Sequence, residues 1–529
     1  RTMRLVRSLL SILLLHSSNS LKFLAYSPQF GASHVHFMGR LSDALVDAGH
    51  EVVMLSSRMD TLIGSTGTKR ARVIEIPQTA EGAQFEHFIN NKMVENVWRE
   101  SSMIKMTQGA EVIMQANIAQ CNATLYHPGL INRLQREKFD VGFTESHDLC
   151  SIGLFHLAGI DKFAITESLA MVDGHFFYSQ VPSNPAYVPS FSSGLAGEQM
   201  SFPERAANFF VSFMTSIAKL SMLQQWEAVF TDYENDFPSL RELVERNSLV
   251  FLNSDPLVEF PRPSAARIVD IGGITVSNGA EPLNETWSSL LSLRPHTILI
   301  SFGSFAKAHL MPDEYKHSII AVAKMFAEVT FIFKYEKPEH RLSEGVDNIV
   351  ETAWMPQNDI LHDDRLTAFV THGGQGSVTE AYYAGIPLVV IPICFDQLRN
   401  AAQVARNGVG LVVEKSELMN EQKLAAAIQA MLTNDRYRAQ ARKVRQLLHE
   451  RPFSTRKVFV RNMEFLGKHG PLRQLDHYGR HLNVLQYYLV DVIAVITGAI
   501  LITLIIIVLL ACAFGRFVIN KINTKSKQD

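Results

Sequence analysis

The chain has few cysteines and almost no excess of charge. Its 529 residues include only four cysteines, too few and too scattered for a dense disulfide scaffold or a cysteine-based metal site. Lys and Arg together number 50 and Asp and Glu number 52, which gives a formal net charge of -2. Proteins that bind nucleic acids usually carry a basic excess. The composition therefore excludes a disulfide-rich mini-protein and predicts no nucleic-acid partner.

Two familiar nucleotide-binding signatures are also missing. No GxGxxG follows the first strand-like run at residues 21–28, which disfavours a dinucleotide-dependent oxidoreductase. The glycine-rich stretch at residues 373–376 lacks the Gly-Lys-Ser/Thr of a P-loop, so Mg²⁺-dependent phosphoryl transfer is not expected. These absences favour a protein that holds its ligand by other means.

The N-terminus has the layout of a secretory signal peptide. Arg4 and Arg7 precede a short, mostly apolar run, and small polar residues follow it, which predicts a cleaved signal over residues 1–20. An ordinary buried helix is the alternative. Asn122 and Asn284 begin sequons that would be open to N-glycosylation in a secretory lumen.

The C-terminus predicts a membrane anchor. Residues 492–514 carry no charged side chain and are long enough to cross a hydrocarbon core of ~30 Å. Basic residues follow this run, so the positive-inside rule predicts a single-pass type I protein with a cytosolic tail at 515–529 and luminal lobes. The last five residues, KSKQD, form a KxKxx pattern that resembles a retrieval signal of the endoplasmic reticulum. A basic tail without that role is the alternative.

The sequence between the ends alternates short β-branched runs with helical patterns, and it does so in two blocks. This pattern predicts an α/β protein with two Rossmann-like, doubly wound lobes and a cleft between them. The expected boundaries are an N-terminal lobe at 21–270, a linker at 271–296, a C-terminal lobe at 297–450 and C-terminal helices with a juxtamembrane segment at 451–490. In the first helix, Ser33 is the expected N-cap.

Two helical stretches of the first lobe are rich in Phe and Met. Phe85–Met106 suits the wall of a permissive pocket for lipophilic small molecules. Phe209–Trp226 is interpreted as an amphipathic core helix, with a membrane-dipping helix or a pocket wall as the alternatives.

The residues that follow the predicted strands of the second lobe include a candidate diphosphate site. His372, Gly374, Gly376 and Ser377 lie where a strand gives way to a helix. The glycines allow a close approach of backbone amides, and the helix N-terminus attracts an anion. A structural glycine-rich turn is the alternative for this segment taken alone.

Neighbouring segments supply partners for the rest of a nucleotide sugar. Trp354 follows another strand and can stack on a heteroaromatic ring, and Gln357 can read the edge of that ring. Glu380 lies one turn into the phosphate-facing helix and can accept from ribose hydroxyls. Asp396 and Gln397 form a polar pair suited to a polyhydroxyl sugar.

Residues 349–410 resemble the signature of the UDP-glycosyltransferases, in particular the animal UDP-glucuronosyltransferase branch. The resemblance rests on WxPQ, HxG, Glu, GxP and DQ, and it extends through GHEV, FPRP and SFGS over nearly the whole chain. It implies a GT-B-like fold, UDP-sugar as co-substrate and no cofactor or metal. It also implies that the donor is held by Ser304, Trp354, Gln357, His372, Gly374, Gly376, Ser377, Glu380, Asp396 and Gln397. Gln375-Gly376 replaces the Asn or His that many relatives have there, so a backbone contact is expected.

His34 is the candidate catalytic base. It follows the first strand at a helix entrance, where the helix dipole is expected to keep its imidazole neutral at pH 7. The Ser-His element of the family falls on His34, with His36 as the alternative. A histidine base usually has an orienting carboxylate. Glu145 takes the position of the family's Asp, and Asp148 is the alternative.

These features together predict a UDP-glucuronosyltransferase-type enzyme of the endoplasmic-reticulum membrane. Such an enzyme would transfer the sugar with inversion to a hydroxyl of a small lipophilic acceptor, in a detoxification role and as a monomer or homo-oligomer. UDP-glucuronic acid is the expected donor, with Arg399 as the candidate cation for its carboxylate. UDP-glucose is the alternative donor. The alternative of another class is a non-catalytic, UDP-sugar-binding membrane partner.

Overall fold

The computed structural model describes residues 20–99, 103–171, 173, 181, 184–190, 197–276 and 281–525. The predicted signal peptide, apart from Ser20, and the last four residues of the KxKxx pattern lie outside these ranges. The chain divides into two compact units, Arg1–Arg473 and Gln474–Asp529. The first unit holds both predicted lobes.

The first lobe is built on a parallel sheet of seven strands. Its inner strands are short runs that are almost entirely buried, which is typical of a parallel sheet covered by helices, whereas its two edge strands are partly exposed. In spatial order they are β3 (Arg72–Ile76), β2 (Glu51–Ser57), β1 (Lys22–Tyr26), β4 (Val141–Glu145), β5 (Phe163–Glu167), β6 (Leu249–Leu252) and β7 (Ile268–Asp270).

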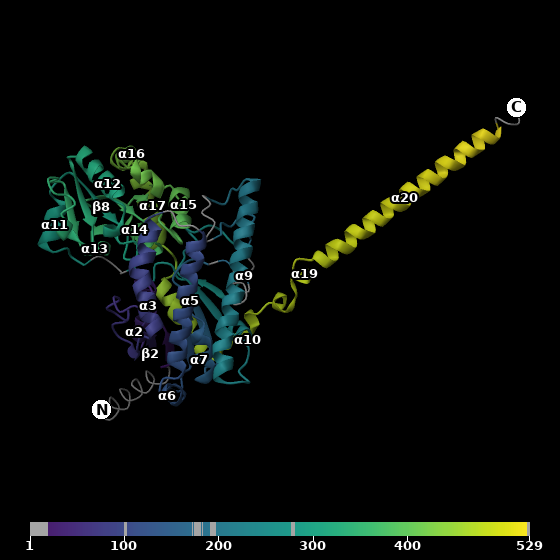
Figure 1. Cartoon of the computed structure of the whole chain (residues 1–529), viewed down its shortest axis with the longest axis horizontal. Coiled ribbons are helices and arrows are strands. Elements are labelled where there is room, and N and C mark those ends of the chain that lie inside the picture. The colour runs from purple at the N-terminus through teal and green to yellow at the C-terminus, as the bar shows by residue number, and fades with distance from the viewer. Residues whose placement is uncertain are drawn as a thin grey trace, which may run out of the picture. The chain divides into compact units, whose positions relative to one another are not determined.

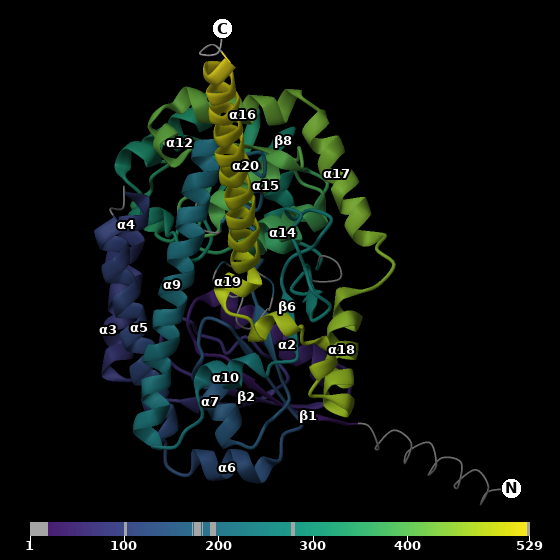
Figure 2. The same ribbon diagram turned by 90° about the vertical axis from the view of Figure 1, so that its right-hand side faces the viewer.

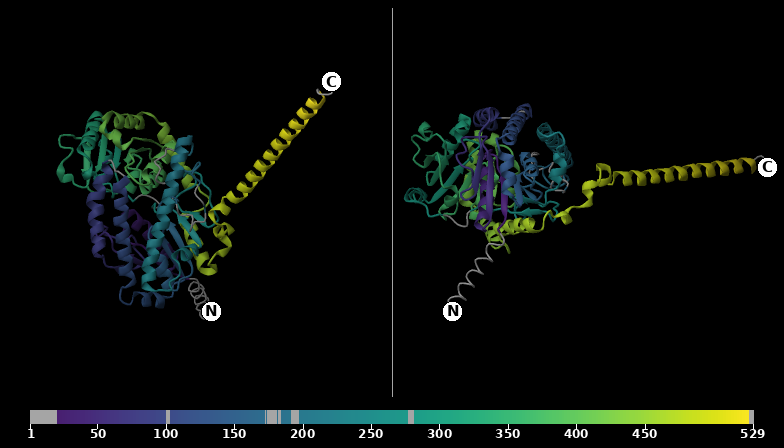
Figure 3. Two further views of the ribbon diagram at one scale, coloured as in Figure 1. Left: turned by 45° about the vertical axis from the view of Figure 1, so that its right-hand side comes forward. Right: turned by 90° about the horizontal axis from the view of Figure 1, so that it is seen from below.

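Helices connect and cover these strands, and the long helices α5 and α9 run side by side (Figures 1 and 3). The expected N-cap of the first helix was wrong by two residues, because Gly31 takes that place with a φ of 69°. The helices are α2 (Ala32–Asp47), α3 (Ala80–His87), the π-helical η1 (Phe88–Met93), α4 (Val94–Trp98), α5 (Met103–Leu125), α6 (Leu130–Glu137), α7 (Cys150–Leu157), α9 (Phe202–Tyr233) and α10 (Leu240–Glu245).

A disulfide between Cys121 and Cys150 joins α5 to α7 inside the core of the first lobe. The number and spacing of the cysteines exclude a dense disulfide scaffold, but they do not indicate that Cys121 and Cys150 pair. Their separation of 29 residues gave no signal, because pairing depends on where the two helices meet.

The second lobe is built on a parallel sheet of six strands, and both doubly wound lobes predicted from the sequence are confirmed. In spatial order its strands are β10 (Ile349–Thr352), β9 (Val329–Lys334), β8 (His296–Ser301), β11 (Leu366–Thr371), β12 (Leu388–Val390) and β13 (Gly410–Val412). Its helices are α11 (Glu285–Leu291), η2 (Ala308–Leu310), α12 (Asp313–Met325), η3 (Pro338–His340), α13 (Gln357–Leu361), α14 (Gln375–Ala384), α15 (Gln397–Arg406), η4 (Lys415–Met419), α16 (Glu421–Thr433) and α17 (Arg436–His449).

After the second lobe the chain returns to the first. Helix α18 (Thr455–His469) packs against α2 and β4 (Figure 2). Its Phe459 ring contacts the rings of Phe143 and Phe251, and its Glu464 lies 3.3 Å from the ring of His50. A segment remote in sequence thus completes the first lobe.

Helix α9 differs along its length. Trp226 and Phe230 in its second half are buried, whereas Phe209 and Phe210 in its first half are each 60% exposed. The core-helix interpretation therefore holds only for the second half. Together with the C-terminal helix, α9 is long and apolar enough to cross a membrane, although its most apolar window is partly buried.

The second unit contains the predicted anchor. Its helix α20 (Val490–Lys525) includes residues 492–514, and the most apolar 18-residue window of Val490–Asn523 has a mean hydropathy of 3.2, with none of that window buried. This helix is a candidate membrane span. Short turns precede it: η5 (Arg473–Leu475), η6 (Tyr478–His481) and α19 (Val484–Tyr487).

Candidate functional site

The candidate residues lie at the points where the strand order of each sheet reverses. In the first sheet β1 and β4 are neighbours, so His34, which follows β1, and Glu145, the last residue of β4, come together. In the second sheet β8 and β11 are neighbours, which does the same for Ser304 and His372. Ligands of open α/β sheets bind at such points, beyond the carboxyl ends of the strands.

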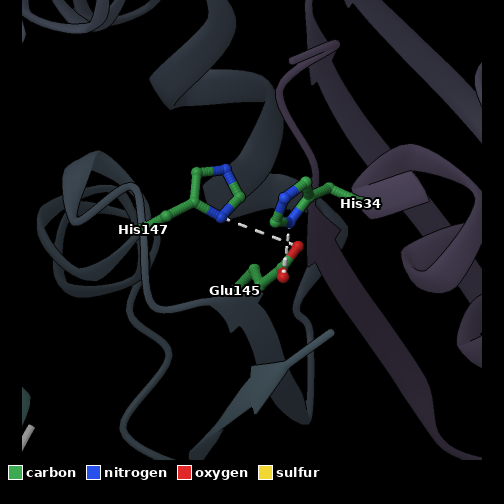
Figure 4. A group of neighbouring side chains, drawn as sticks. All are labelled: His34, Glu145 and His147. Carbon is green, nitrogen blue, oxygen red and sulfur yellow. Dashed lines mark hydrogen bonds and ion pairs between the residues drawn. The ribbon is translucent and has the colours of Figure 1, made fainter. Parts of the chain in front are cut away.

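His34 and Glu145 form a hydrogen-bonded pair (Figure 4). His34 Nδ1 lies 2.8 Å from Glu145 Oε1 and 2.9 Å from the hydroxyl of Ser168. The backbone N–H of Ser168 also donates to Glu145 Oε1, at 2.9 Å. Glu145 is 3% exposed, whereas about a quarter of the His34 side chain (24%) is open to solvent. A buried carboxylate therefore orients a reachable imidazole.

The charges of this pair stabilise each other. Burial would raise the pKa of Glu145, but the neighbouring His34 and His147 outweigh that effect and lower the pKa to about 2. Burial would lower the pKa of His34, but the charge and hydrogen bond of Glu145 raise it above its ordinary value. The expectation that the helix dipole dominates His34 was wrong, because an adjacent buried carboxylate acts more strongly.

Gly31 makes the position of His34 possible. A Cβ at residue 31 would lie 2.9 Å from His34 Cδ2, and the φ of 69° is left-handed. Only glycine adopts this conformation without strain. The turn after β1 is thus shaped around the histidine.

Asp148 does not reach His34. Its carboxylate accepts hydrogen bonds from the hydroxyl of Tyr26 at 3.2 Å and from the backbone N–H of Cys150 at 2.9 Å. Burial raises the pKa of Asp148 to about 7. Of the two carboxylates left open by the sequence, Glu145 is the partner of His34, and Asp148 supports the turn into α7.

We expect Asp148→Asn to change stability in a pH-dependent way. The pKa of about 7 in the folded chain exceeds the ordinary value of 3.8, so the folded state binds the proton more tightly than the unfolded state. Wild-type stability is therefore lost as the pH rises from about 4 to about 7, by about 1.4 kcal/mol per pH unit. Asparagine cannot ionise, so the melting temperature of the variant relative to the wild type should rise over this range. An equal difference at pH 5 and pH 8 would contradict the assignment.

His147 completes the group in Figure 4 and was missed by the sequence analysis. Its Nδ1 lies 3.6 Å from Glu145 Oε2, and its ring centroid lies 5.0 Å from that of His34. Burial lowers the pKa of His147 to about 4. The ring of Phe30 contacts both histidines. The only feature of the sequence that could have indicated His147 is its position two residues after Glu145.

The candidate diphosphate site centres on His372. Its ring is held between two glycines, since a Cβ at Gly303 or at Gly374 would lie 2.7 Å or 2.6 Å from the imidazole. Burial and the nearby charge of Lys334 lower the pKa of His372 to about 4, so the ring is neutral at pH 7. Lys334 donates to the carbonyl of Gly303 at 2.5 Å, and sequence reasoning missed it.

The other predicted phosphate contacts surround this histidine. Gly374 is the N-cap of α14, and Gly376 lies in its exposed first turn, where an added Cβ would meet no neighbour. Ser304 is exposed in the turn that follows β8. The N-terminus of α14 is a surface at which backbone N–H groups can meet an anion.

The predicted base and ribose partners come together. Gln357 donates to Glu380 Oε2 at 2.7 Å and to the hydroxyl of Ser377 at 3.2 Å. Burial raises the pKa of Glu380 above its ordinary value. Trp354 is 69% exposed at the end of β10, so its indole face is available for stacking.

The predicted sugar partners differ in their roles. Asp396 Oδ2 accepts from Asn400 at 2.7 Å and from the backbone N–H of Gln375 at 3.2 Å, and burial raises its pKa. Gln397 is buried, and its amide oxygen accepts from the backbone N–H groups of residues 393 and 394. In this structure Gln397 therefore shapes the loop, and Asp396 is the side chain of the pair that faces the first lobe.

Arg399 is not available to a ligand, so its prediction was wrong. Its guanidinium forms a two-pronged ion pair with Glu259, at 2.8 and 2.9 Å, and lies over the ring of Phe260. Both partners of this ion pair are 4% exposed. The arginine joins α15 to the end of the first lobe.

The two half-sites face each other across the lobes. After Glu145, the negative charge of Asp396 is one of the charges that raise the pKa of His34. The side chain of Gln375, next to the diphosphate site, donates to the carbonyl of Asn253 in the first lobe at 3.0 Å. Away from the site, Trp98 donates to the carbonyl of Lys307 at 3.0 Å, so this part of the predicted pocket wall instead holds the lobes together.

The comparisons with known proteins agree with this arrangement. A family model described as "UDP-glucoronosyl and UDP-glucosyl transferase" matches residues 24–528. The nematode protein ugt-48 of Caenorhabditis elegans is 29% identical over 96% of this chain and 97% of its own length. Mouse UDP-glucuronosyltransferase 1A6 is 26% identical (92% and 90%), and mouse 2-hydroxyacylsphingosine 1-beta-galactosyltransferase is 28% identical (91% and 86%).

Solved structures show the same fold at low sequence identity. The glycotransferase of kitacinnamycin has a TM-score of 0.58 and 16% identity, over 84% of this chain and 99% of that chain. The spinosyn forosaminyltransferase SpnP has a TM-score of 0.56 and 17% identity, over 85% and 100%. The predicted GT-B-like fold is confirmed.

Proposed function

Because the chain belongs to the family of UDP-glucuronosyl and UDP-glucosyl transferases, we propose that it transfers a sugar from a UDP-sugar to a hydroxyl of a small lipophilic acceptor, with His34 as the base. The observation that carries the proposal is the buried Glu145 carboxylate 2.8 Å from His34 Nδ1, in a site that faces Asp396. An orienting carboxylate and a partly exposed imidazole are what a general base requires.

Nδ1–H of His34 donates a hydrogen bond to Glu145, so the lone pair of Nε2 is free to take the acceptor's hydroxyl proton. The acceptor oxygen attacks the anomeric carbon as the bond from that carbon to the diphosphate oxygen breaks. UDP departs with the electron pair, and the attack from the opposite face inverts the configuration. Glu145 stabilises the imidazolium that forms, without taking its proton.

The departing diphosphate carries the charge that develops in this step. The N-terminus of α14, the ring of His372 and the ammonium of Lys334 are the groups gathered to receive it. These groups can stabilise the leaving group without a cation from solution. We propose that transfer needs no metal and no cofactor.

We expect Lys334→Met to slow transfer by weakening the diphosphate site. Loss of a hydrogen bond to a charged group costs about 1.5–3 kcal/mol, which is roughly 10–150-fold in kcat/KM. Lys334→Arg should retain most of the activity. Lys337→Met in the exposed loop that follows is the matched control. Steady-state kinetics with a labelled UDP-sugar check this, and equal rates for Lys334→Met and Lys337→Met would rule out the role.

UDP-glucuronic acid is the donor that we propose, with UDP-glucose as the alternative. The matched relatives include a glucuronosyltransferase and a galactosyltransferase, so both charged and neutral sugars occur among them. With Arg399 engaged, the candidate cation for a sugar carboxylate is Lys219 on α9. Its charge reaches His147 and interacts with Glu167.

We expect Lys219→Gln to reduce transfer from UDP-glucuronic acid more than transfer from UDP-glucose, because only the first sugar carries a carboxylate. An exposed or partly exposed charge pair contributes roughly 1 kcal/mol, so the ratio of the two kcat/KM values should fall about five-fold. The neutral donor is the internal control. An unchanged ratio would remove Lys219 from donor selection.

The proposed function is tested by incubating microsomes that contain the chain with labelled UDP-glucuronic acid, UDP-glucose and UDP-galactose, each with one phenolic acceptor. Label in the acceptor product, absent with His34→Ala, supports the proposal. If UDP binds but neither transfer nor donor hydrolysis occurs over a broad acceptor panel, the chain is a non-catalytic UDP-sugar-binding partner.

We also propose that the lobes are luminal in the endoplasmic reticulum, in a detoxification role. Three features support this location: the candidate span α20, the basic tail and the disulfide between Cys121 and Cys150, since disulfides form in oxidising compartments. Asn284 is an exposed N-cap and the better sequon, because Thr124 of the Asn122 sequon is fully buried.

A further inference from the structure

His34, Glu145 and His147 together offer more nitrogen and oxygen atoms that could bind a metal than the His34–Glu145 hydrogen bond uses. Glu145 Oε2 and both ring nitrogens of His147 have no hydrogen-bond partner among the residues that the structure describes. Buried polar atoms are rarely left in this state. Glu145 is 3% exposed, so water does not readily satisfy its free oxygen.

One ring nitrogen of each histidine points toward the Glu145 carboxylate (Figure 4). One ligand atom from each of the three side chains lies within 4.8 Å of the other two. His34 Nδ1 is 2.8 Å from Glu145 Oε1, and His147 Nδ1 is 3.6 Å from Glu145 Oε2. Two ligands bonded at about 2.1 Å in a tetrahedral site lie roughly 3.4 Å apart. The two imidazole–carboxylate distances, 2.8 and 3.6 Å, lie on either side of that spacing.

We propose that His34, Glu145 and His147 form a site for Zn²⁺ that inhibits the enzyme. Two imidazoles and one carboxylate are a ligand set that zinc favours, and the fourth position stays open to water. The surroundings are electrostatically suitable, because the carboxylates of Glu167 and Asp396 add negative potential at His34. His34 and Lys219 are the positive groups that act on His147.

The bound ion would disable the base by changing its tautomer. Zn²⁺ bonds to Nδ1 of His34 through the lone pair that appears when the ring proton moves from Nδ1 to Nε2. No proton is gained or lost, but Nε2 then carries a hydrogen and cannot accept one from the acceptor hydroxyl. The UDP contacts lie in the second lobe and are unaffected. Zn²⁺ should therefore lower kcat and leave the affinity for UDP unchanged.

The first experiment measures binding and does not depend on catalysis. The full-length protein in detergent competes with a chromophoric chelator for Zn²⁺, as wild type, His147→Asn and Glu145→Gln. We expect one site per chain in the wild type and at least ten-fold weaker binding in both variants. His36→Gln removes an exposed histidine on α2 and is the matched control, which should bind as the wild type does.

The second experiment measures inhibition and rests on the proposed function. Zn²⁺ should inhibit wild-type transfer reversibly, with recovery on adding EDTA, and the concentration for half inhibition should rise at least ten-fold in His147→Asn, relative to that variant's own uninhibited rate. Melting curves establish that each variant is folded. Unchanged Zn²⁺ affinity in both folded variants, or equal weakening in His36→Gln, would overturn the site. Absence of transfer in the wild type would sink the proposed function but not the metal site.

Discussion

His34→Ala is expected to reduce transfer by about 10²–10⁴-fold, because the acceptor hydroxyl loses its base. UDP contacts none of the first-lobe dyad in the proposed arrangement, so its affinity should stay within about two-fold. Single-turnover transfer and UDP binding by calorimetry measure the two quantities separately. The imidazole is partly open to solvent, and its removal leaves two buried partner groups, the Glu145 carboxylate and the Ser168 hydroxyl.

His36→Ala is the control for this experiment. His36 lies two residues further along α2, is exposed, and accepts a hydrogen bond from Arg40 at 3.4 Å. Its removal should leave transfer within about two-fold. Transfer by His34→Ala at a rate near that of the wild type would end the proposed mechanism.

Glu145→Gln should also reduce kcat by about 10²–10⁴-fold, the range expected when a base loses the group that orients and charges it. The pKa of about 2 shows that Glu145 is ionised throughout the working range of pH. A neutral amide removes that charge and also permits the wrong tautomer of His34. The lost activity should appear mainly in kcat, since UDP does not touch the amide.

The pH profile separates this role from a structural one. Glu145 raises the pKa of His34, and the base form of His34 exists only above that pKa. In the wild type, kcat/KM should therefore fall on acidification at a pH above the ordinary histidine value. In Glu145→Gln the residual activity should lose this support, and the acidic limb should move to lower pH. If the acidic limb of the Glu145→Gln profile does not move, or if Asp148→Asn lowers kcat by as much as Glu145→Gln does, Glu145 is not the residue that orients His34.

Most of the fold followed from local patterns. Every strand predicted in the second lobe is present, because β-branched runs such as Ile298–Ile300 are buried on both faces of a parallel sheet. The packing of α18 on the first lobe could not be predicted. Its amphipathic pattern shows that one face of the helix is apolar, but not which lobe that face packs against. The exposure of the first half of α9 was not predicted for a similar reason, since apolar content alone does not show whether a helix face is buried or exposed to solvent.

Site residues could be predicted where a polar or titratable residue lies at the end of a predicted strand. His34, Glu145 and His372 all lie where strand ends meet. Choosing between Glu145 and Asp148 needed three-dimensional geometry, because both lie near the end of β4 and the sequence does not show which side chain reaches His34. The prediction for Arg399 failed because its buried partner, Glu259, lies 140 residues away in the chain. Lys334 and His147 carry no motif, and their proximity to the site depends on the packing of neighbouring strands and loops.

The course of α18 determines how this protein can be divided. The segment 455–469 covers apolar rings of the first lobe, including Phe143 and Phe251. A fragment that stops at β7 would leave these rings uncovered, and a fragment that starts at β8 would carry a helix with no surface to pack on. The first lobe is therefore not a contiguous piece of sequence, whereas the second lobe is. Separate expression of the first lobe would require residues 455–469 to be joined to residues 20–270, by fusion or by permutation of the chain.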